Sequence, residues 1–469
     1  MSRNDRSINQ MRRRLLAGLG AAMATSAVAL PWPMRLAMGQ TPRSLSDYKA
    51  VICIFLRGGN DGNDTIIPVD GAYQDYARVR GAIALPKEEL ARLNLANTER
   101  KLALNPALAP LQPLVDRGDV AWIANAGPLV APISAEEVRN GRARMPSLLG
   151  SHPDQQRHVS GGVPGTFAQN SGWGGRTLEA LPKDYVDALL SNLAANEHHW
   201  VMRGKYWAPT IAEDREYFNN INLREILQGE SSLDFEAYRQ AVRANSGGDD
   251  LSFAYRSSMG SVLDEVLELR RVLDTVPDDL APPVPNEPEH SIGEQLRTAT
   301  RTLWAGREAG IKRQMVNIDW GGFDTHAEQR GSSLEHQDGQ LAALAHALVD
   351  LDKHLTKGGL HDQVVTMILS EFGRPLQPNS SGGTDHAWGN HFFVMGGPVK
   401  GNRLIGQMPE LVLGGPDDMD YDGQGRWVPT INTDQISASV MEWFGLPRAD
   451  FGQVFPYLDQ FPNSTLDLF

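Results

Sequence analysis

The chain has 469 residues, of which 41% are hydrophobic and 22% charged; this is globular usage, and the length allows about three domains or one large α/β domain. It carries 44 Lys and Arg against 57 Asp and Glu, and the formal net charge of -13 excludes a generally basic nucleic-acid-binding protein. The single cysteine, Cys53, excludes an intramolecular disulfide and a cysteine-based zinc or iron–sulfur site.

The first 39 residues have the pattern of a cleaved export signal. Arg12–Arg14 precede a mildly apolar stretch from Leu15 to Leu30, and Ala37–Gly39 supplies small residues for a signal peptidase. Paired arginines before a weakly apolar core favour the twin-arginine pathway, whose translocase would be a partner during export. A membrane anchor is the alternative, but the stretch is shorter than the roughly 20 residues that span a bilayer, so no stable anchor is expected.

Residues 40–47 are predicted to be a linker, and the mature protein is expected in the periplasm or outside the cell. Removal of residues 1–39 takes away six Arg and one Asp, which changes the net charge from -13 to -18. That charge argues against general binding to DNA or to membrane surfaces, whereas a small anionic ligand focused by metal ions is compatible with it.

Five short apolar segments predict the strands of a doubly wound α/β sheet. The first, Lys49–Leu56, shows no polar alternation, which is typical of a strand buried on both faces of a parallel sheet. The others are Val120–Asn125, Gln314–Ile318, Val364–Leu369 and His391–Met395. We therefore expect one α/β domain over residues 48–469.

Helical patterns accompany these strands, at Pro106–Arg117, at Leu334–Leu355 and at Thr433–Phe444. Residues 178–308 differ, because they are largely helical and charged and are interrupted by the proline-rich segment Pro282–Pro288. We expect this range to be a helical insertion or cap within the domain, since few apolar runs there could form a separate core.

Four polar clusters lie next to predicted strands: Arg57–Asp64, Gly321–His326, Ser370–Arg374 and Gly383–His391. The first three follow a strand, and the fourth leads into one. The carboxyl ends of the strands in an open α/β sheet lie along one edge, where ligands bind. Clusters that are far apart in sequence are therefore expected to converge into one site.

Carboxylates and neutral imidazoles are the ligands that zinc, manganese or iron prefer in proteins. The candidate ligands of one or two divalent ions are Asp61, Asp324, His326, Glu371, His386 and His391. Asp385 is a candidate for orienting its neighbour. The structural alternatives are a turn at Asp61, a helix N-cap at Asp324, and neutralisation of Glu371 by Arg374.

Ser151 is the candidate nucleophile, at the expected N-terminus of a helix, where the positive end of the helix would favour an anionic substrate. A purely structural N-cap is the alternative. His152 and Asp154 could contribute to a metal or substrate site. Arg57 and Arg374 are candidates for clamping an anion, with salt bridging as the alternative.

The remaining candidates have structural interpretations. Trp173 could line a pocket or pack in the core, and Cys53 is expected to be a small core residue. Four histidines in or beside the predicted helix Leu334–Leu355 are expected at the surface: His336, His346, His354 and His361.

In chain order, these motifs resemble the large bacterial family catalogued as domain of unknown function 1501. The matching segments are Phe55–Gly62, Ser151–Gln156, Gly172–Arg176, Gly322–His326, Ser370–Arg374 and Gly383–His386. They span nearly the whole mature chain. Members of that family commonly carry twin-arginine signals, in agreement with the pattern of residues 1–39.

More distantly, the layout is similar to the alkaline phosphatase-like superfamily of phosphatases, sulfatases and cofactor-independent phosphoglycerate mutases. That resemblance implies a three-layer α/β/α fold, a mostly parallel sheet, and metal ions at the strand ends. It maps the superfamily's metal and nucleophile positions to Asp61, Asp324, His326, Glu371, His386 and Ser151. Two departures, one residue between Asp324 and His326 and no histidine after Glu371, leave one-metal, two-metal and metal-free sites open.

The sequence thus predicts an exported metal-dependent hydrolase or transferase that acts on a small anionic ester, a phosphate or a sulfate, with zinc or manganese as cofactor. The alternative is a non-catalytic periplasmic binding or assembly protein on the same fold. A dehydrogenase is disfavoured, because Gly58–Gly62 has neither the spacing of a dinucleotide fingerprint nor that of a P-loop.

Overall fold

The structure is a computed structural model that describes residues 47–161, 171–187, 191–195, 201–204, 275–282, 291–420 and 422–469. The predicted signal at 1–39, nearly all of the predicted linker at 40–47 and most of the predicted insertion at 178–308 lie outside the described residues.

The described residues form a main sheet of eight strands in the order β10-β5-β9-β8-β1-β7-β6, with β11 paired to β5. In chain order its strands are β1 Lys49–Leu56, β5 Val120–Gly127, β6 Asn192–Ala194, β7 Arg313–Trp320, β8 Val364–Ser370, β9 Asn390–Met395, β10 Arg403–Ile405 and β11 Ile431–Asn432. All pairs are parallel except those of β9, which runs antiparallel to both β5 and β8. The predicted mostly parallel sheet is confirmed.

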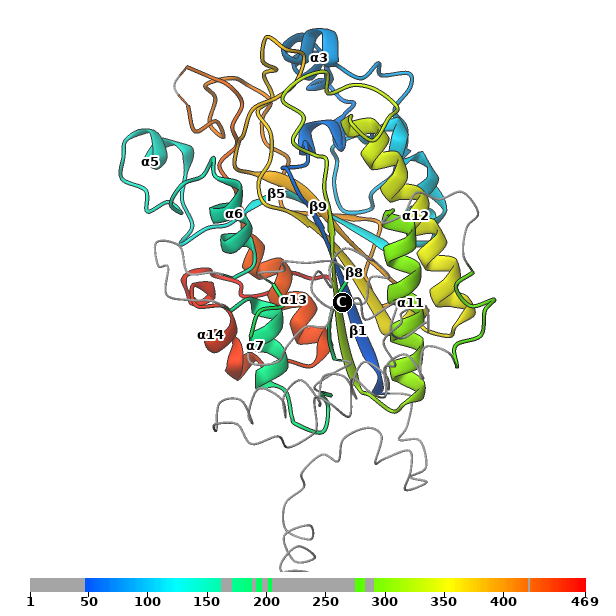
Figure 1. The fold of residues 1–469 in the computed structure, drawn as a ribbon. Helices are drawn as coiled ribbons and strands as arrows, with labels where there is room; N and C mark the ends of the chain where they lie inside the picture. Colours follow the sequence, from blue (N-terminus) through cyan, green and yellow to red (C-terminus); the bar gives the residue numbers. More distant parts are fainter. Residues whose placement is uncertain are drawn as a thin grey trace, which may run out of the picture.

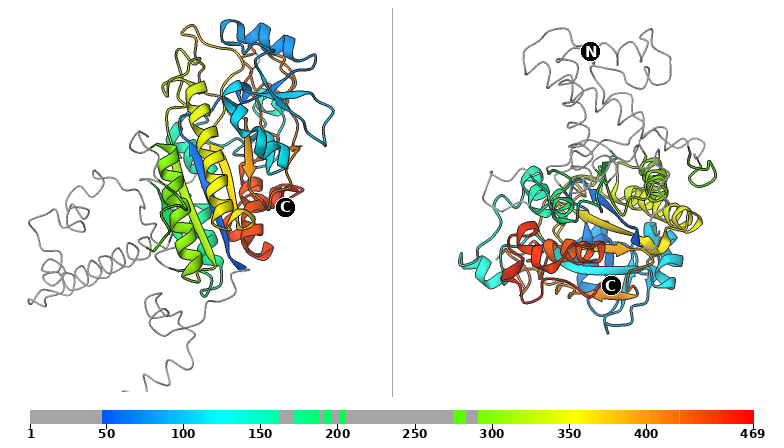
Figure 2. Two further views of the ribbon diagram at one scale, coloured as in Figure 1. Left: turned by 90° about the vertical axis from the view of Figure 1, so that its right-hand side faces the viewer. Right: turned by 90° about the horizontal axis from the view of Figure 1, so that it is seen from below.

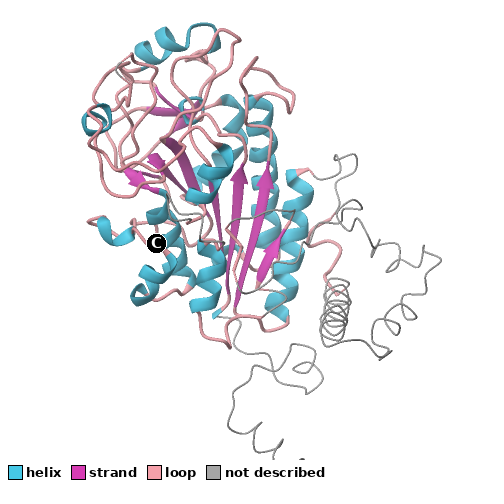
Figure 3. Ribbon diagram, turned by 60° about the vertical axis from the view of Figure 1, so that its left-hand side comes forward, coloured by secondary structure: helices cyan, strands magenta, loops and turns pink. Residues whose placement is uncertain are grey.

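Helices cover both faces of this sheet, which makes the fold a three-layer α/β/α structure (Figures 1 and 3). One layer consists of η4 Pro106–Leu111, α4 Gln112–Arg117, α11 Ile292–Glu308 and α12 Gln337–Lys357. The other consists mainly of α7 Trp173–Ala180, α13 Thr433–Phe444 and α14 Phe451–Val454. Figure 2 shows the sheet edge-on between them.

The central strand β1 explains why both layers are needed. Ile52 and Ile54 pack into the core under α11 and α12, whereas Val51, Cys53 and Phe55 pack into the core under α7 and α13. Successive side chains of a strand point to opposite faces, so an uninterrupted apolar run needs cover on both. Cys53 is fully buried, as expected.

Smaller elements lie beyond the carboxyl edge of the main sheet or beside it (Figure 1). A second sheet of three antiparallel strands has the order β2-β4-β3. Its strands are β2 Ile66–Pro68, β3 Ala91–Leu93 and β4 Leu102–Leu104, and the short helices are α3 Tyr73–Arg80, α5 Ala135–Arg139 and α6 His152–Val159. Single turns of 3₁₀ helix are η2 Gly62–Asp64, η3 Gly81–Ile83, η5 His361–Gln363, η6 Arg448–Asp450 and η7 Leu458–Gln460.

The described ends of the predicted insertion at 178–308 pack with the central layers, because β6 pairs with β7 and α11 packs Leu296 and Leu303 into the main core. The helical insertion or cap itself stays a prediction. One sequence expectation needs correction. His354 is buried rather than at the surface, because it lies on the covered side of α12. Trp173 is fully buried and packs in the core.

None of the helices in the described ranges has the length and apolar composition that crossing a membrane requires.

Candidate metal centre

Three loops leave the main sheet at the same level. The register pairs Leu56 of β1 with Trp320 of β7 and with Ser370 of β8, so the loops that follow start side by side. They approach closely at Gly58, which has a φ of 113° and where a Cβ atom would lie 2.4 Å from the backbone nitrogen of Asp324. Only glycine tolerates both conditions, and the three predicted clusters therefore converge.

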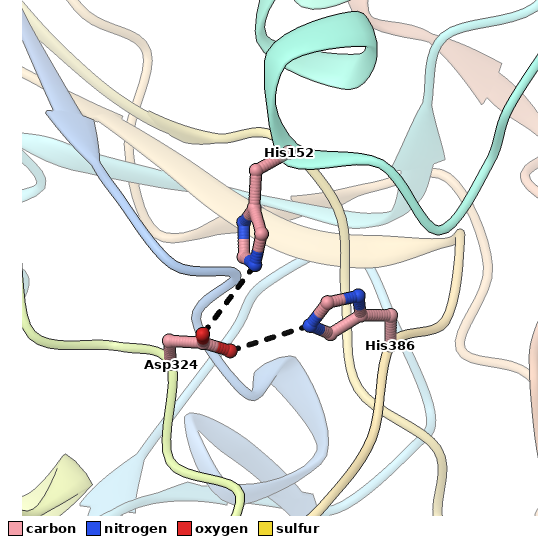
Figure 4. A group of neighbouring side chains, drawn as sticks. All are labelled: His152, Asp324 and His386. Carbon is pink, nitrogen blue, oxygen red and sulfur yellow. Dashed lines mark hydrogen bonds and ion pairs between the residues drawn. The ribbon is translucent and has the colours of Figure 1, made fainter.

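The side chains of His152, Asp324 and His386 form a group that could hold a metal ion (Figure 4). His152 is the first residue of α6, Asp324 follows β7, and His386 precedes β9. Nε2 of His152 lies 3.5 Å from Oδ2 of Asp324, and Nε2 of His386 lies 3.3 Å from Oδ1. The candidate ligand atoms all lie within 4.8 Å of one another.

His326 extends this group. Its Nε2 lies 3.1 Å from Oδ1 of Asp324 and 3.0 Å from Nε2 of His386. We call the group of His152, Asp324, His326 and His386, which is a candidate site for a metal ion, the metal centre. The sequence predicted Asp324, His326 and His386 as ligands and proposed His152 for a metal or substrate site; the structure brings all four together.

Each imidazole of the metal centre is oriented through its other nitrogen. Nδ1 of His386 lies 2.8 Å from the carbonyl oxygen of Gly150, which can only accept, so Nδ1 carries the proton. Nδ1 of His326 lies 3.2 Å from Oδ1 of Asp385, and Nδ1 of His152 lies 2.9 Å from Oε1 of Glu371. These contacts direct the Nε2 atoms toward Asp324, and in the neutral imidazoles that carry the proton on Nδ1 these atoms present their lone pairs.

This arrangement passes a chemical test for a cation site. Nε2 atoms and a carboxylate oxygen at about 3 Å from one another need a positive charge among them, which either a proton on an imidazole or a bound metal ion supplies. A histidine whose second nitrogen donates to a carboxylate or carbonyl is also the common form of a metal-ligating histidine. The residues present therefore fit a divalent ion bound by imidazole and carboxylate groups.

Glu371 orients His152 rather than pointing into the metal centre. The carboxylate is fully buried, and its Oε1 accepts from the backbone nitrogen of Gly58 at 2.8 Å and from Gln156 at 3.2 Å, besides its contact with His152. Burial acts to raise the pKa of Glu371, but these hydrogen bonds outweigh it and lower the pKa below its ordinary value.

Arg374 holds the loops together and has no donor left for a substrate anion. It is fully buried and donates to the carbonyl oxygens of Gly58, of Gly59 at 2.8 Å and of Thr384 at 2.6 Å. It also donates to Oδ1 of Asp324 at 2.6 Å. Partial burial raises the pKa of Asp324, and the bond from Arg374 more than offsets it, so the pKa is lowered.

Asp61 lies outside the metal centre. Its carboxylate is fully buried and forms a bidentate ion pair with Arg80, at 2.6 and 2.8 Å, while Gln329 donates to Oδ2 at 2.8 Å. Its oxygens are thus occupied by Arg80 and Gln329. Sequence reasoning missed both partners, because nothing in the local pattern links Arg80 at the end of α3 to the end of β1.

His391 is also separate from the metal centre. It is buried in β9, and its Nδ1 accepts a hydrogen bond from the backbone nitrogen of Asn125 at 3.0 Å. Burial lowers the pKa of His391 to about 4. Because its Nδ1 is bonded to the backbone and its ring is buried within β9, His391 has a structural role.

Ser151 and Arg57 directly precede His152 and Gly58 in the sequence. Ser151 precedes α6 without capping it, and its Oγ donates to Oδ2 of Asp154 at 2.5 Å. Arg57 follows β1, its side chain is 44% exposed, and its guanidinium lies 3.6 Å from the carboxylate of Asp319. Their predicted roles as nucleophile and anion clamp remain predictions.

A second acidic group lies at the opposite end of the sheet. Asp119 precedes β5, Asp352 is on α12 and His361 is in η5 before β8. Arg117 forms ion pairs with Asp119 at 2.7 Å and with Asp352 at 2.8 Å. A guanidinium already neutralises these carboxylates, so this group fits a metal ion less well than the metal centre does.

Residues 48–414 match the family described as "Protein of unknown function (DUF1501)", and the chain belongs to this family. No curated protein matches the sequence.

Solved structures to which the chain is similar include three with TM-scores of 0.33 or lower. The lipoteichoic acid synthase LtaP from Listeria monocytogenes has 10% identity and a TM-score of 0.33, with 88% of this chain and 78% of that chain covered. The phosphonate monoester hydrolase SpPMH from Silicibacter pomeroyi has 10% identity and a TM-score of 0.32, with 86% and 74% covered. The PsFucS1 sulfatase from Pseudoalteromonas sp. has 10% identity and a TM-score of 0.30, with 81% and 67% covered.

Proposed function

We propose that this member of the DUF1501 family is an exported metal-dependent hydrolase or transferase that acts on phosphate or sulfate esters. The observation that carries the proposal is the orientation of the three imidazoles: each Nδ1 lies against an acceptor, so that each Nε2 faces Asp324. The resemblance of the motif order to the alkaline phosphatase-like superfamily supports the reaction class.

His152, Asp324 and His386 would hold one divalent ion, zinc or manganese, with His326 as a fourth ligand. A second ion is disfavoured, because Asp61 is already neutralised by Arg80. When bound, the ion would act as a Lewis acid toward the anionic group of the ester.

The residues around the metal centre supply the other functions that ester cleavage needs. The side chains of His152, Asp324, His326 and His386 are 29%, 45%, 45% and 21% exposed, so a substrate can reach them. The half-exposed guanidinium of Arg57 would bind two oxygens of the anionic group. The hydroxyl of Ser151 would attack the phosphorus or sulfur atom and pass its proton to Asp154, and the bond to the ester oxygen would break, with the departing alkoxide taking a proton from water. Water would then cleave the seryl ester, which releases phosphate or sulfate and restores the Ser151 hydroxyl.

Metal analysis combined with an ester panel tests the proposal. Purified protein should contain about one zinc or manganese ion per chain, and Asp324→Ala or His386→Ala should lose the ion and about 100-fold or more of the turnover of aryl phosphates or aryl sulfates. His346→Ala is the matched control, because His346 is an exposed histidine of α12. Variants that keep both metal and turnover would refute the proposal. Bound metal without turnover of any ester would favour the alternative, a periplasmic binding protein.

Export through the twin-arginine pathway is part of the proposal. A Lys replacement of both Arg12 and Arg13 should leave the protein in the cytoplasm, because paired arginines are the feature that route requires. Cell fractionation with an antibody against the mature chain measures this. Unchanged periplasmic protein would count against the twin-arginine assignment and leave the metal centre unaffected.

A further inference from the structure

The loop of residues 141–150, which lies between α5 and α6 (Figure 1), exposes the apolar side chains of Met145 and Leu148. Among the described residues, four large hydrophobic side chains are exposed, and two of them, Met145 at 39% and Leu148 at 60%, are in this loop. The other two are Leu334 and Val412. Scattered apolar side chains are ordinary on a protein surface, so exposure alone does not indicate a binding site, and the position of Met145 and Leu148 must be considered.

The loop is attached directly to the metal centre. The carbonyl oxygen of Gly150 accepts the hydrogen bond from His386 that fixes the imidazole, and His152 begins α6 two residues later. Leu148 precedes Gly150 by two residues, a distance of at most about 7 Å along the chain. The backbone of an exposed apolar residue therefore lies within about 7 Å of the residue that orients His386.

The fold fixes the backbone at Leu148 while leaving its side chain in solvent. Leu148 has a φ of 53°, a left-handed conformation that residues with a side chain rarely adopt and that recurs at ligand-binding positions. Its carbonyl oxygen accepts from the backbone of Ser151 at 2.9 Å and from the buried side chain of Gln155 at 2.9 Å. The buried His158 bonds the carbonyl oxygen of Ser147 at 3.2 Å.

The same loop is locally basic in an acidic protein. It contains Arg142 and Arg144 and no Asp or Glu, whereas the chain as a whole has a net charge of -13. Arg142 is 65% exposed, and its ion pair with Glu136 is long at 3.6 Å. Arg144 lies over the ring of Tyr457 at 5.6 Å. Positive charge next to exposed apolar surface is complementary to an anionic molecule that carries a hydrocarbon chain.

We propose that loop 141–150 binds the alkyl chain of an amphiphilic anionic ester whose head group lies at the metal centre. The proposal rests on the proposed function and adds the substrate class to it. Leu148 and Met145 would contact the chain, and Arg142 would attract the anion. The occupant is a single dissolved amphiphile rather than a membrane surface.

The test uses methyl-, butyl- and octylphosphonate, which resemble the head group and are not hydrolysed, at concentrations below micelle formation. Calorimetric titration of the metal-loaded full chain should give a Kd that falls up to about fourfold for each methylene group that the loop buries. In the double variant Met145→Ser, Leu148→Ser the octylphosphonate Kd should rise about tenfold or more, while the methylphosphonate Kd stays the same. Val412→Ser, a change of an exposed apolar residue on another loop, should alter neither.

The outcomes separate the loop from the metal centre. A Kd that does not depend on chain length, or a dependence that the double variant leaves intact, overturns the loop proposal even if methylphosphonate still binds. Failure of methylphosphonate to bind, with the chain-length dependence present and sensitive to Leu148, counts against the proposed function and supports the apolar site. Sedimentation with phosphatidylglycerol vesicles that depends on Leu148, without any chain-length dependence, would replace the dissolved amphiphile with a membrane surface.

Discussion

Oε1 of Glu371 lies 2.9 Å from Nδ1 of His152, which ties a fully buried carboxylate at the end of β8 to an imidazole at the start of α6. The contact crosses from the sheet to the outer helical layer. It fixes which nitrogen of His152 faces Asp324, so the interior of the protein determines the chemistry of a partly exposed group.

Replacement of Glu371→Gln should therefore weaken metal binding without removing a ligand. The amide keeps the volume and an acceptor oxygen but loses the charge that favours the required tautomer, and we expect about 10-fold weaker affinity. Competition with a chromogenic chelator measures the metal Kd, and the thermal midpoint reports on folding. An unchanged Kd would show that the contact does not orient the ligand.

Loss of Arg80 should destabilise the fold strongly. Arg80→Met leaves the buried carboxylate of Asp61 without its guanidinium, and removal of one partner of a buried pair costs about 3–5 kcal/mol. Asp64 loses one of its two guanidinium partners and keeps Arg330 at 3.3 Å. Urea unfolding measures this, and the double variant Arg80→Met, Asp61→Asn should recover part of the loss. If Asp61→Asn instead abolished metal binding at unchanged stability, Asp61 would be a ligand after all.

Asp434 should make stability depend on pH. Burial raises its pKa to about 7 from a usual value of 3.8, with Arg176 acting in the opposite direction. Between these values the folded state holds a proton that the unfolded state releases, so this group lowers stability as pH rises from about 4 to about 7. Asp434→Asn should remove the effect, and its stabilisation relative to wild type should grow between about pH 5 and about pH 8 in urea unfolding. An advantage that is the same at both pH values would contradict the assignment.

His391 should act in the opposite sense and bind no metal. Its pKa of about 4, against an ordinary 6.5, means that the unfolded state takes up a proton that the buried imidazole refuses. The contribution of the neutral, buried His391 to the free energy of unfolding is then fully present above about pH 6.5 and declines as the pH falls toward about 4. His391→Gln should reduce this acid sensitivity and leave the metal content unchanged. Metal loss in this variant, with the fold intact by circular dichroism, would place His391 among the ligands.

The sequence predicted the strands and the edge at which the site lies, because unbroken apolar runs such as Lys49–Leu56 report burial on both faces. Polar clusters at the carboxyl ends of these strands are therefore expected to lie close together at one edge of the sheet. It could not predict that β9 runs antiparallel, since the apolar pattern of a strand carries no information on its direction.

Within the site, the sequence predicted residue types better than partners. Asp324 and His386 could be found from their chemistry and position, whereas the bond from His386 to the carbonyl of Gly150 involves an atom that every residue possesses. The pairing of Asp61 with Arg80 likewise depends on where α3 packs. The partners in these contacts are determined by tertiary packing, which leaves no signal in the local sequence.

The four members of the metal centre come from segments that are separated by up to 234 positions along the chain, from His152 to His386. They can meet only after β1, β7, β8 and β9 have all taken their places, so capture of an ion would mark the completion of folding. A metal ion that binds at this last stage of folding would stabilise only fully folded molecules. If the protein is exported after it has folded, as proposed, the bound metal ion would distinguish fully folded molecules from incompletely folded ones before export.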